Sequence, residues 1–252
     1  MPLARSSVAS VQTTIQLGGL VQSAPVIAQL FGTGSVWSPV NTALTGVTGG
    51  NLLVSLGGWW NSTAGNGGTS ALPVDTNGTL VVAQNPVLPD GVAAPGWPVG
   101  GQITHILSAA AGAHTFTPPN IGGSGDGYYL VSEFAGLGGS AWALVDSGNN
   151  VAKTGTPGAI TTVTVSTAGA ATQPGDLIVC LAVSDGNPSA VGLGAPTGYP
   201  NTLLSTLTTL TNIGAGAGWK IATASGTQSA TWTWVSTDTQ IVWGLMAVYR
   251  RS

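Results

Sequence analysis

The chain has 252 residues, of which only 5% are charged, and its formal net charge at pH 7 is −3. Five basic residues against eight acidic ones, with Arg250-Arg251 as the single basic cluster, argue against a nucleic-acid-binding surface. No apolar run approaches the length of about 18 residues that a membrane-spanning helix needs, so we expect no membrane insertion.

Glycine and proline indicate the fold class. The chain contains 39 glycines and 15 prolines, and these are the two residues that destabilise helices most. No segment has helical periodicity over more than a turn or two, whereas many short stretches alternate apolar and polar residues between turn signals. We therefore predict an all-β protein with a sandwich or jelly-roll architecture.

The predicted strands follow one another with turn residues between them. In chain order they cover residues 8–17, 26–31, 52–56, 79–83, 103–107, 128–134, 141–145, 160–165, 177–181, 203–210, 230–234 and 241–249. The last of these is apolar on both faces, so we expect it to be covered on both sides. Most aspartates, including Asp75 and Asp146, lie in turn-like sequences, and we interpret them as turn formers and not as catalysts.

One sequence pattern occurs twice. The stretch from Gly49 to Leu56 returns 125 positions later as Pro174 to Leu181. A glycine-terminated motif then precedes a Thr- and aromatic-rich stretch in both copies, and the glycine and the last aromatic are 22 residues apart in the first copy and 23 in the second. We predict two tandem homologous β-sandwich (jelly-roll-like) modules. The predicted division is an N-terminal arm at 1–20, a first module at 21–150 and a second module at 151–252.

Few groups are available for catalysis. His105 and His114 are nine residues apart, and the second copy has no histidine at either place. The sequence has no nucleophile elbow, metal-ligand pair or phosphate loop. Asp126 and Glu133 remain as a hypothetical carboxylate pair for glycoside cleavage, and Cys180 is interpreted as a core residue. We expect no enzyme activity, no metal and no cofactor.

Four tryptophans are candidate binding residues. Trp37 and Trp97 lie in loop-like sequences beside prolines or glycines, and Trp59 and Trp60 precede a stretch rich in Asn and Gly. Adjacent strand residues point to opposite faces, so one of Trp59 and Trp60 should face outward or into a loop. Exposed aromatics of this kind stack on sugar rings or anchor another protein, and both interpretations stay open.

The scarcity of charge favours an assembly. No charged residue lies between Arg5 and Asp75. A surface of Thr, Ser, Asn, Gln and Ala suits packing against other subunits, because every charge buried in an interface needs a partner. We therefore expect a homo-oligomer or another permanent assembly.

Short motifs resemble a known group of proteins. They lie at Gly175 to Val179, Gly218 to Thr227 and Ala247 to Arg250, with weaker counterparts at Gly50 to Val54, Ala109 to Gly112 and Glu133-Phe134. The pattern resembles the duplicated β-sandwich proteins encoded among the structural genes of tailed bacteriophages, although the first copy lacks the Trp-Lys pair. The resemblance implies a virion protein, as head decoration or cement or as a tail or fibre accessory, with other virion proteins as partners. An adhesin that binds host-surface glycans is the alternative.

Overall fold

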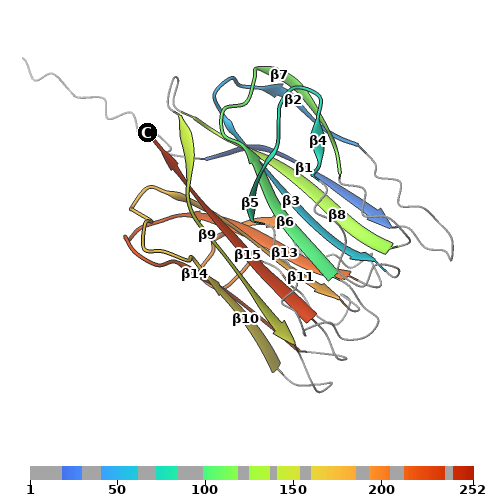
Figure 1. The fold of residues 1–252 in the computed structure, drawn as a ribbon, viewed down its shortest axis with the longest axis vertical. Coiled ribbons are helices and arrows are strands. Elements are labelled where there is room, and N and C mark those ends of the chain that lie inside the picture. Colours follow the sequence, from blue (N-terminus) through green and yellow to red (C-terminus); the bar gives the residue numbers. More distant parts are fainter. Residues whose placement is uncertain are drawn as a thin grey trace, which may run out of the picture.

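A computed structural model describes residues 19–29, 41–61, 72–84, 99–118, 125–136, 141–153, 160–185, 193, 195–204, 213–235 and 241–252. These residues form β-strands and the turns between them, and no helix occurs among them, so none could span a membrane (Figure 1). The prediction of an all-β protein is confirmed. The strand predicted at 8–17 and the end of the one predicted at 203–210 lie outside the described residues.

The strands belong to four antiparallel sheets. The first half of the chain contributes β1 (Leu20–Gln29), β2 (Thr42–Val47), β3 (Leu52–Asn61), β4 (Val74–Asp75), β5 (Val81–Gln84), β6 (Val99–Ile106), β7 (Gly112–Thr117) and β8 (Gly125–Phe134). The second half contributes β9 (Trp142–Lys153), β10 (Ile160–Ser166), β11 (Leu177–Asp185), β12 (Asn201–Leu204), β13 (Ile213–Ile221), β14 (Ser229–Val235) and β15 (Ile241–Arg251).

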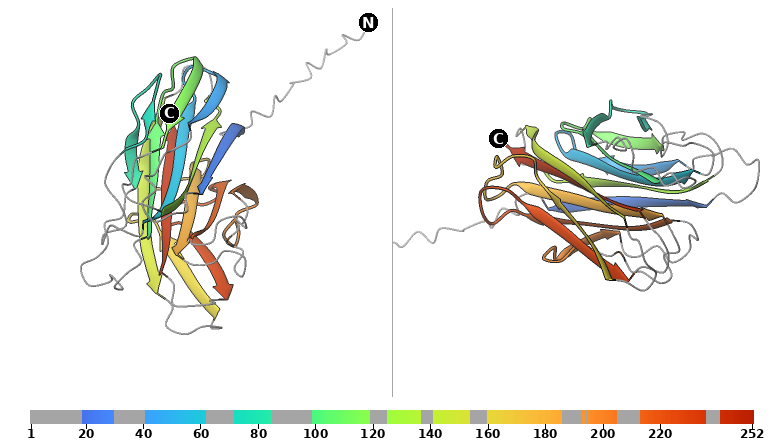
Figure 2. Two further views of the ribbon diagram at one scale, coloured as in Figure 1. Left: turned by 90° about the vertical axis from the view of Figure 1, so that its right-hand side faces the viewer. Right: turned by 60° about the horizontal axis from the view of Figure 1, so that its bottom comes forward.

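Each half forms one large and one small sheet. The first large sheet has the strand order β1-β8-β3-β6-β5, and the first small sheet has the order β2-β7-β4. The second large sheet has the order β12-β13-β11-β15-β9, and the second small sheet pairs β10 with β14. Figure 2 shows the sheets from the side, with the two large ones facing each other.

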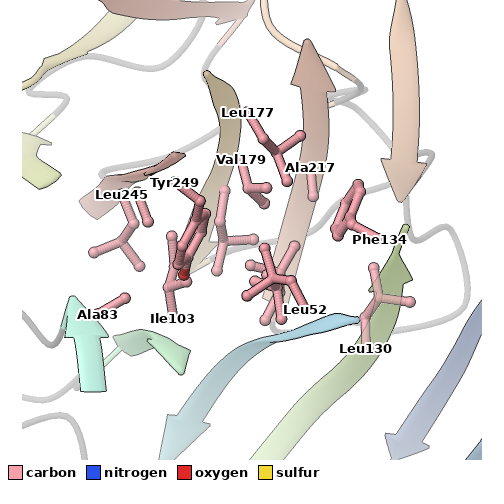
Figure 3. Close-up of a cluster of buried hydrophobic side chains, with 14 of the residues drawn as sticks. Leu52, Ala83, Ile103, Leu130, Phe134, Leu177, Val179, Ala217, Leu245 and Tyr249 are labelled. Carbon is pink, nitrogen blue, oxygen red and sulfur yellow. The ribbon is translucent and has the colours of Figure 1, made fainter. Parts of the chain in front are cut away.

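Three apolar clusters hold the sheets together in four layers. The largest lies between the two large sheets and includes Leu52, Leu130, Leu177 and Leu245 (Figure 3). A second cluster joins the second large sheet to the second small sheet through residues such as Trp232. The third joins the first large sheet to the first small sheet. Both large sheets are therefore buried on both faces.

This layering explains why the central strands lack alternation. In β15, Trp243 and Leu245 face the opposite large sheet, whereas Val242 and Met246 face the second small sheet. All of the residues from 242 to 249 are buried. The prediction that this strand is covered on both sides is confirmed, and the apolar runs of β3 and β11 have the same cause.

Four aspartates predicted to form turns lie in strands instead: Asp75, Asp126, Asp146 and Asp185. Asp75 ends β4 and is buried. Asp146 lies inside β9, beside a register shift at the point where β9 pairs with Val248 and Tyr249 of β15. Its carboxylate accepts a hydrogen bond from the Ser147 amide at 2.8 Å. A bulge exposes backbone groups much as a turn does, so the sequence signals of the two are alike.

The two large sheets have the same strand arrangement. In the first large sheet the central strand β3 lies between β8 and β6. In the second the central strand β11 lies between β15 and β13. The edges are β1 and β5 in the first sheet and β9 and β12 in the second. The expected boundary near residue 150 falls inside β9, which pairs with β15, so the whole of β9 is part of the second large sheet.

The turn before each central strand is also the same. Gly50 and Gly175 adopt φ angles of +86° and +94°, which favour glycine. Gly50 N–H donates to Ala109 O at 2.9 Å, and Ala109 N–H donates back to the residue after Gly50 at 2.9 Å. In the second half, Gly175 N–H donates to Ala222 O and Ala222 N–H donates to Asp176 O, both at 2.8 Å.

His105 is a buried polar group at the contact between the large sheets. It lies on β6 with 3% of its surface exposed, and its ring packs edge-on against Tyr249 with 5.5 Å between ring centroids. Burial lowers the pKa of His105 from its usual 6.5 to about 4. Burial also raises the pKa of Tyr249, so both side chains are neutral at pH 7.

The His105 pKa predicts loss of stability in acid. Its stabilising contribution is fully present above pH 6.5 and declines as the pH falls toward 4, because the unfolded chain then takes up a proton that the folded chain excludes. This shift corresponds to at most about 3 kcal/mol. Urea unfolding of the wild type and His105→Phe at pH 7.5 and 4.5 should show a smaller acid-induced loss in the variant. An equal loss in both proteins would contradict the assignment.

Candidate functional site

The structure places one of the four candidate tryptophans in the interior. Trp59 lies on β3, with 4% of its surface exposed, and its ring lies over Gly57 of the same strand. Trp59 therefore offers no surface to a ligand. Trp60 pairs with Val99 and Asp126 in the sheet. Trp37 and Trp97 lie outside the described residues.

Several separate groups of ionisable side chains lie inside the fold. The first consists of His114 and Asp75. The His114 Nδ1 and Asp75 Oδ2 atoms are 2.6 Å apart, and both side chains have 0% exposure. The other ring nitrogen, Nε2, is 2.9 Å from Ala110 O. Both ring nitrogens thus face oxygen atoms, so each contact contains a proton and the pair has no net charge. The pair fastens β4 to β7 beneath the first small sheet.

Glu133 is a second internal carboxylate. It is fully buried on β8 and accepts hydrogen bonds from Thr48 N at 2.9 Å, Asn51 Nδ2 at 2.6 Å and Gln22 Nε2 at 2.5 Å. Three donors offset the cost of burying the charge. Glu133 therefore ties β1 and the turn before β3 to β8.

The hypothesis of a catalytic carboxylate pair is wrong. Asp126 and Glu133 lie on the same strand, β8, seven positions apart. Extended chain of that length separates their Cα atoms by about 23 Å. Paired glycosidase carboxyls are at most about 10 Å apart, so these two cannot act on one glycosidic bond.

Asp176 and Arg250 form the third internal arrangement. Arg250 Nε donates to Asp176 Oδ1 at 2.9 Å, and Nη2 donates to Oδ2 at 2.7 Å. Nη2 also donates to Ala171 O at 2.6 Å, and Gln173 N donates to Asp176 Oδ2 at 2.7 Å. The hydrogen bonds to Asp176 raise the pKa of Arg250. This bidentate pair holds the 171–176 turn against β15.

The outer face of the second small sheet bears hydroxyl groups and no charge. Its exposed or half-exposed residues are Thr162, Thr164 and Ser166 on β10 and Ser229, Thr231 and Thr233 on β14. They pair across the two strands. Thr164 and Thr231 hydroxyls are 2.9 Å apart, and those of Ser166 and Ser229 are 2.8 Å apart.

The outer face of the first small sheet is similar. It presents Ala43 and Thr45 from β2, Thr115 and Thr117 from β7, and Val74, which is 64% exposed, from β4. No charged side chain points outward from the described residues of either small sheet. The described parts of both outer faces are therefore uncharged.

Aliphatic side chains are exposed at the edges of the first large sheet. Leu20 and Val21 lie on β1, where Val21 is 52% exposed, and Val81 on β5 is also 52% exposed. Each of these strands has a hydrogen-bonded neighbour on one side. An open edge with apolar side chains is a surface that other strands or subunits contact readily.

The described residues contain no cluster of His, Cys, Asp and Glu that could hold a metal ion. Cys180 is fully buried on β11, where its thiol donates to Gly218 O at 3.3 Å. Burial raises the pKa of this thiol. The interpretation of Cys180 as a core residue is confirmed.

Comparison with known proteins is sparse. No family model matches the sequence, and no curated protein matches it. Among solved structures, the major capsid protein P2 from Bacteriophage PM2 matches over 90% of this chain and 98% of that chain, with a TM-score of 0.27 and 8% identity. At this level the similarity identifies no family and no function.

The buried His114–Asp75 pair predicts a large cost for removing one partner. His114→Leu should destabilise the chain by about 3–5 kcal/mol, because it leaves a buried carboxylate without its partner. The double variant Asp75→Leu with His114→Leu should be more stable than His114→Leu alone, since no unpaired charge remains. Urea unfolding at pH 7 measures both. A loss below about 1 kcal/mol in His114→Leu would contradict the pairing.

Proposed function

We propose that this chain is a non-enzymatic structural protein of a bacteriophage virion. It is present in many copies and acts through protein–protein contacts, as capsid decoration or cement or as a tail-associated component. The observation that carries the proposal is the placement of charge. Asp75, Glu133 and Asp176 are buried in internal networks, and the outer faces of both small sheets are uncharged.

Uncharged outer faces suit permanent contacts between subunits. Transferring a charged side chain from water into an interface is costly without a partner, whereas hydroxyl and methyl groups are desolvated at much lower cost. The central parts of protein interfaces are accordingly depleted in charged residues. A freely soluble monomer, in contrast, benefits from charge distributed over its surface.

The virion part of the proposal is supported by the sequence motifs that resemble phage structural proteins. Those motifs coincide with structural features in the second half. Residues 175–179 contain the turn glycine and the start of β11, and residues 247–250 lie in the last part of β15. An adhesin that uses the four tryptophans has less support, because Trp59 is buried.

We also propose that the two halves are two copies of one unit. The matched strand order of the large sheets supports this, as do the equivalent turns at Gly50 and Gly175. The glycines of the second sequence motif, Gly112 and Gly226, also share positive φ angles, of +120° and +99°. The boundary between the units then falls between β8 and β9.

The assembly proposal predicts the mass of the purified protein. Light scattering should give a discrete closed oligomer of the 24.9 kDa chain. A variant that begins at residue 19 keeps Gly19, whose carbonyl accepts a hydrogen bond from Ala135 N at 2.9 Å. We expect this variant to associate more weakly if the N-terminal arm contributes to contacts. A monomer at all concentrations, with or without the arm, would overturn the proposal.

A charge on the outer face of the second small sheet should disrupt the assembly. Thr164→Glu places a carboxylate at an exposed position on β10, so the fold should tolerate it. In the oligomer the same carboxylate is desolvated without a partner, so dissociation should increase at least about tenfold, or about 1.4 kcal/mol. Thr223→Glu, in an exposed turn, is the matched control. Sedimentation velocity compares them, and equal behaviour of the two variants would exclude this face as a contact.

A further inference from the structure

A pocket of about 220 Å³ lies at one end of the second large sheet. It is formed by the end of β15, the start of β9 and the turn before β11. The lining residues are Trp142, Gln173, Pro174, Gly175, Asp176, Arg250 and Arg251. None of them is among the residues that form the outer faces of the small sheets.

The two arginines differ in how they are bonded. Arg250 is committed to Asp176 through two hydrogen bonds. Arg251 has no carboxylate partner among the described residues. Its Nη1 is 3.5 Å from Ala135 O, at the limit for a hydrogen bond, and its guanidinium carbon is 5.9 Å from the centre of the Trp142 ring. The pocket therefore has an excess positive charge at Arg251.

Partial burial adds to this imbalance. Desolvation lowers the pKa of Arg251, and no anion among the described residues is recorded as raising it. The guanidinium remains charged at neutral pH because its ordinary pKa is above 12. An anion bound beside Arg251 would replace the interaction with water that this guanidinium has lost through partial burial.

The fold does not require arginines at this place. Leu52 pairs with Phe134 in the first half, and Leu177 pairs with Tyr249 in the second. The next two residues are Ala135 and Gly136 in the first half, where the second half has Arg250 and Arg251.

The corresponding turn of the first half is held without a cation. There, Gly136 N donates to Asn51 Oδ1 at 2.7 Å. The chain has five basic residues in all, and two of them line this one pocket. Their convergence is thus a feature beyond what the fold demands.

Trp142 supplies a second group without a partner. Its side chain is 5% exposed, and its indole N–H has no hydrogen-bond acceptor within the described structure. A buried N–H without an acceptor is costly. This N–H is covered by protein atoms, so the Gln173 side chain is the further polar group that the lining offers to a ligand.

We propose that this pocket binds a carboxylate-bearing sugar unit, of the uronic acid class. The carboxylate pairs with Arg251, hydroxyl groups meet Gln173, and the ring lies against Pro174. A volume of 220 Å³ equals about seven water molecules. That is more than a carboxylate fills, and it leaves room for the six-membered ring that bears it. The inference does not depend on the assembly proposal.

Saturation-transfer NMR on the full chain tests the ligand class with three probes. We expect D-glucuronate to bind saturably with a millimolar Kd. D-Glucose, which has the same ring without the carboxylate, and acetate, which has the carboxylate without the ring, should each bind at least tenfold more weakly. No saturable binding of glucuronate, or binding of glucose or acetate as tight as that of glucuronate, would overturn the proposal.

Variants test the site. Arg251→Gln should weaken glucuronate binding at least tenfold, because it removes the charge that pairs with the carboxylate. Lys220→Gln is the matched control, since it removes one positive charge outside the pocket, where Lys220 lies 4.4 Å from the centre of the Tyr199 ring. Unfolding curves confirm that each variant is folded. Unchanged binding in Arg251→Gln, or equal loss in Lys220→Gln, would place the site elsewhere.

Discussion

The contact between the two large sheets is the constraint on which the rest of the molecule depends. Each large sheet has an apolar face that only the other large sheet covers, through residues such as Leu130 and Leu245. The opposite faces are covered by the small sheets, so the central strands β3, β11 and β15 are buried on both sides. Strands in such a position have no place for an ionised side chain without a partner. The few charges near them therefore lie at strand ends and turns, where backbone and amide donors are available, as at Glu133 and Asp176.

The nature of the outer surface follows from this layering. A small sheet that covers a large one needs an apolar inner face, and period-two alternation then leaves its other face for polar residues. In β10 and β14 these are threonine and serine, which pair across the strands through their hydroxyl groups. The result is a hydroxyl-bearing surface without charge, which is the physical basis of the assembly proposal. The arginine pocket is the exception, because Arg251 at the end of β15 has no carboxylate partner among the described residues.

Particular elements show where sequence patterns were sufficient and where they failed. Strand β15 was predictable with both of its faces, because its apolar residues are large and β-favouring. Strand β13 was not, since its sequence IGAGAGWKI begins with the small residues that strands usually lack. Its place between β11 and β12 explains those residues. Ala215 and Ala217 fit against the opposite large sheet, and a side chain at Gly218 would come within 3.1 Å of Ala195. From the sequence, Asp75 was likewise predicted to be a turn residue. In the structure it lies on β4 beside His114, which is 39 positions away in the chain.

The sequence by itself determined the class of structure. Its glycine and proline content, strand periodicity and scarcity of charge indicated an all-β protein with buried central strands and a sparsely charged surface. These features are local or compositional, so no long-range contact is needed to find them. Only the tertiary structure decided that the two large sheets face each other, that Trp59 is internal and that Arg251 lines a pocket with Trp142. Each of these depends on contacts between residues distant in the chain, and such contacts follow from sheet order and packing, which local patterns do not specify.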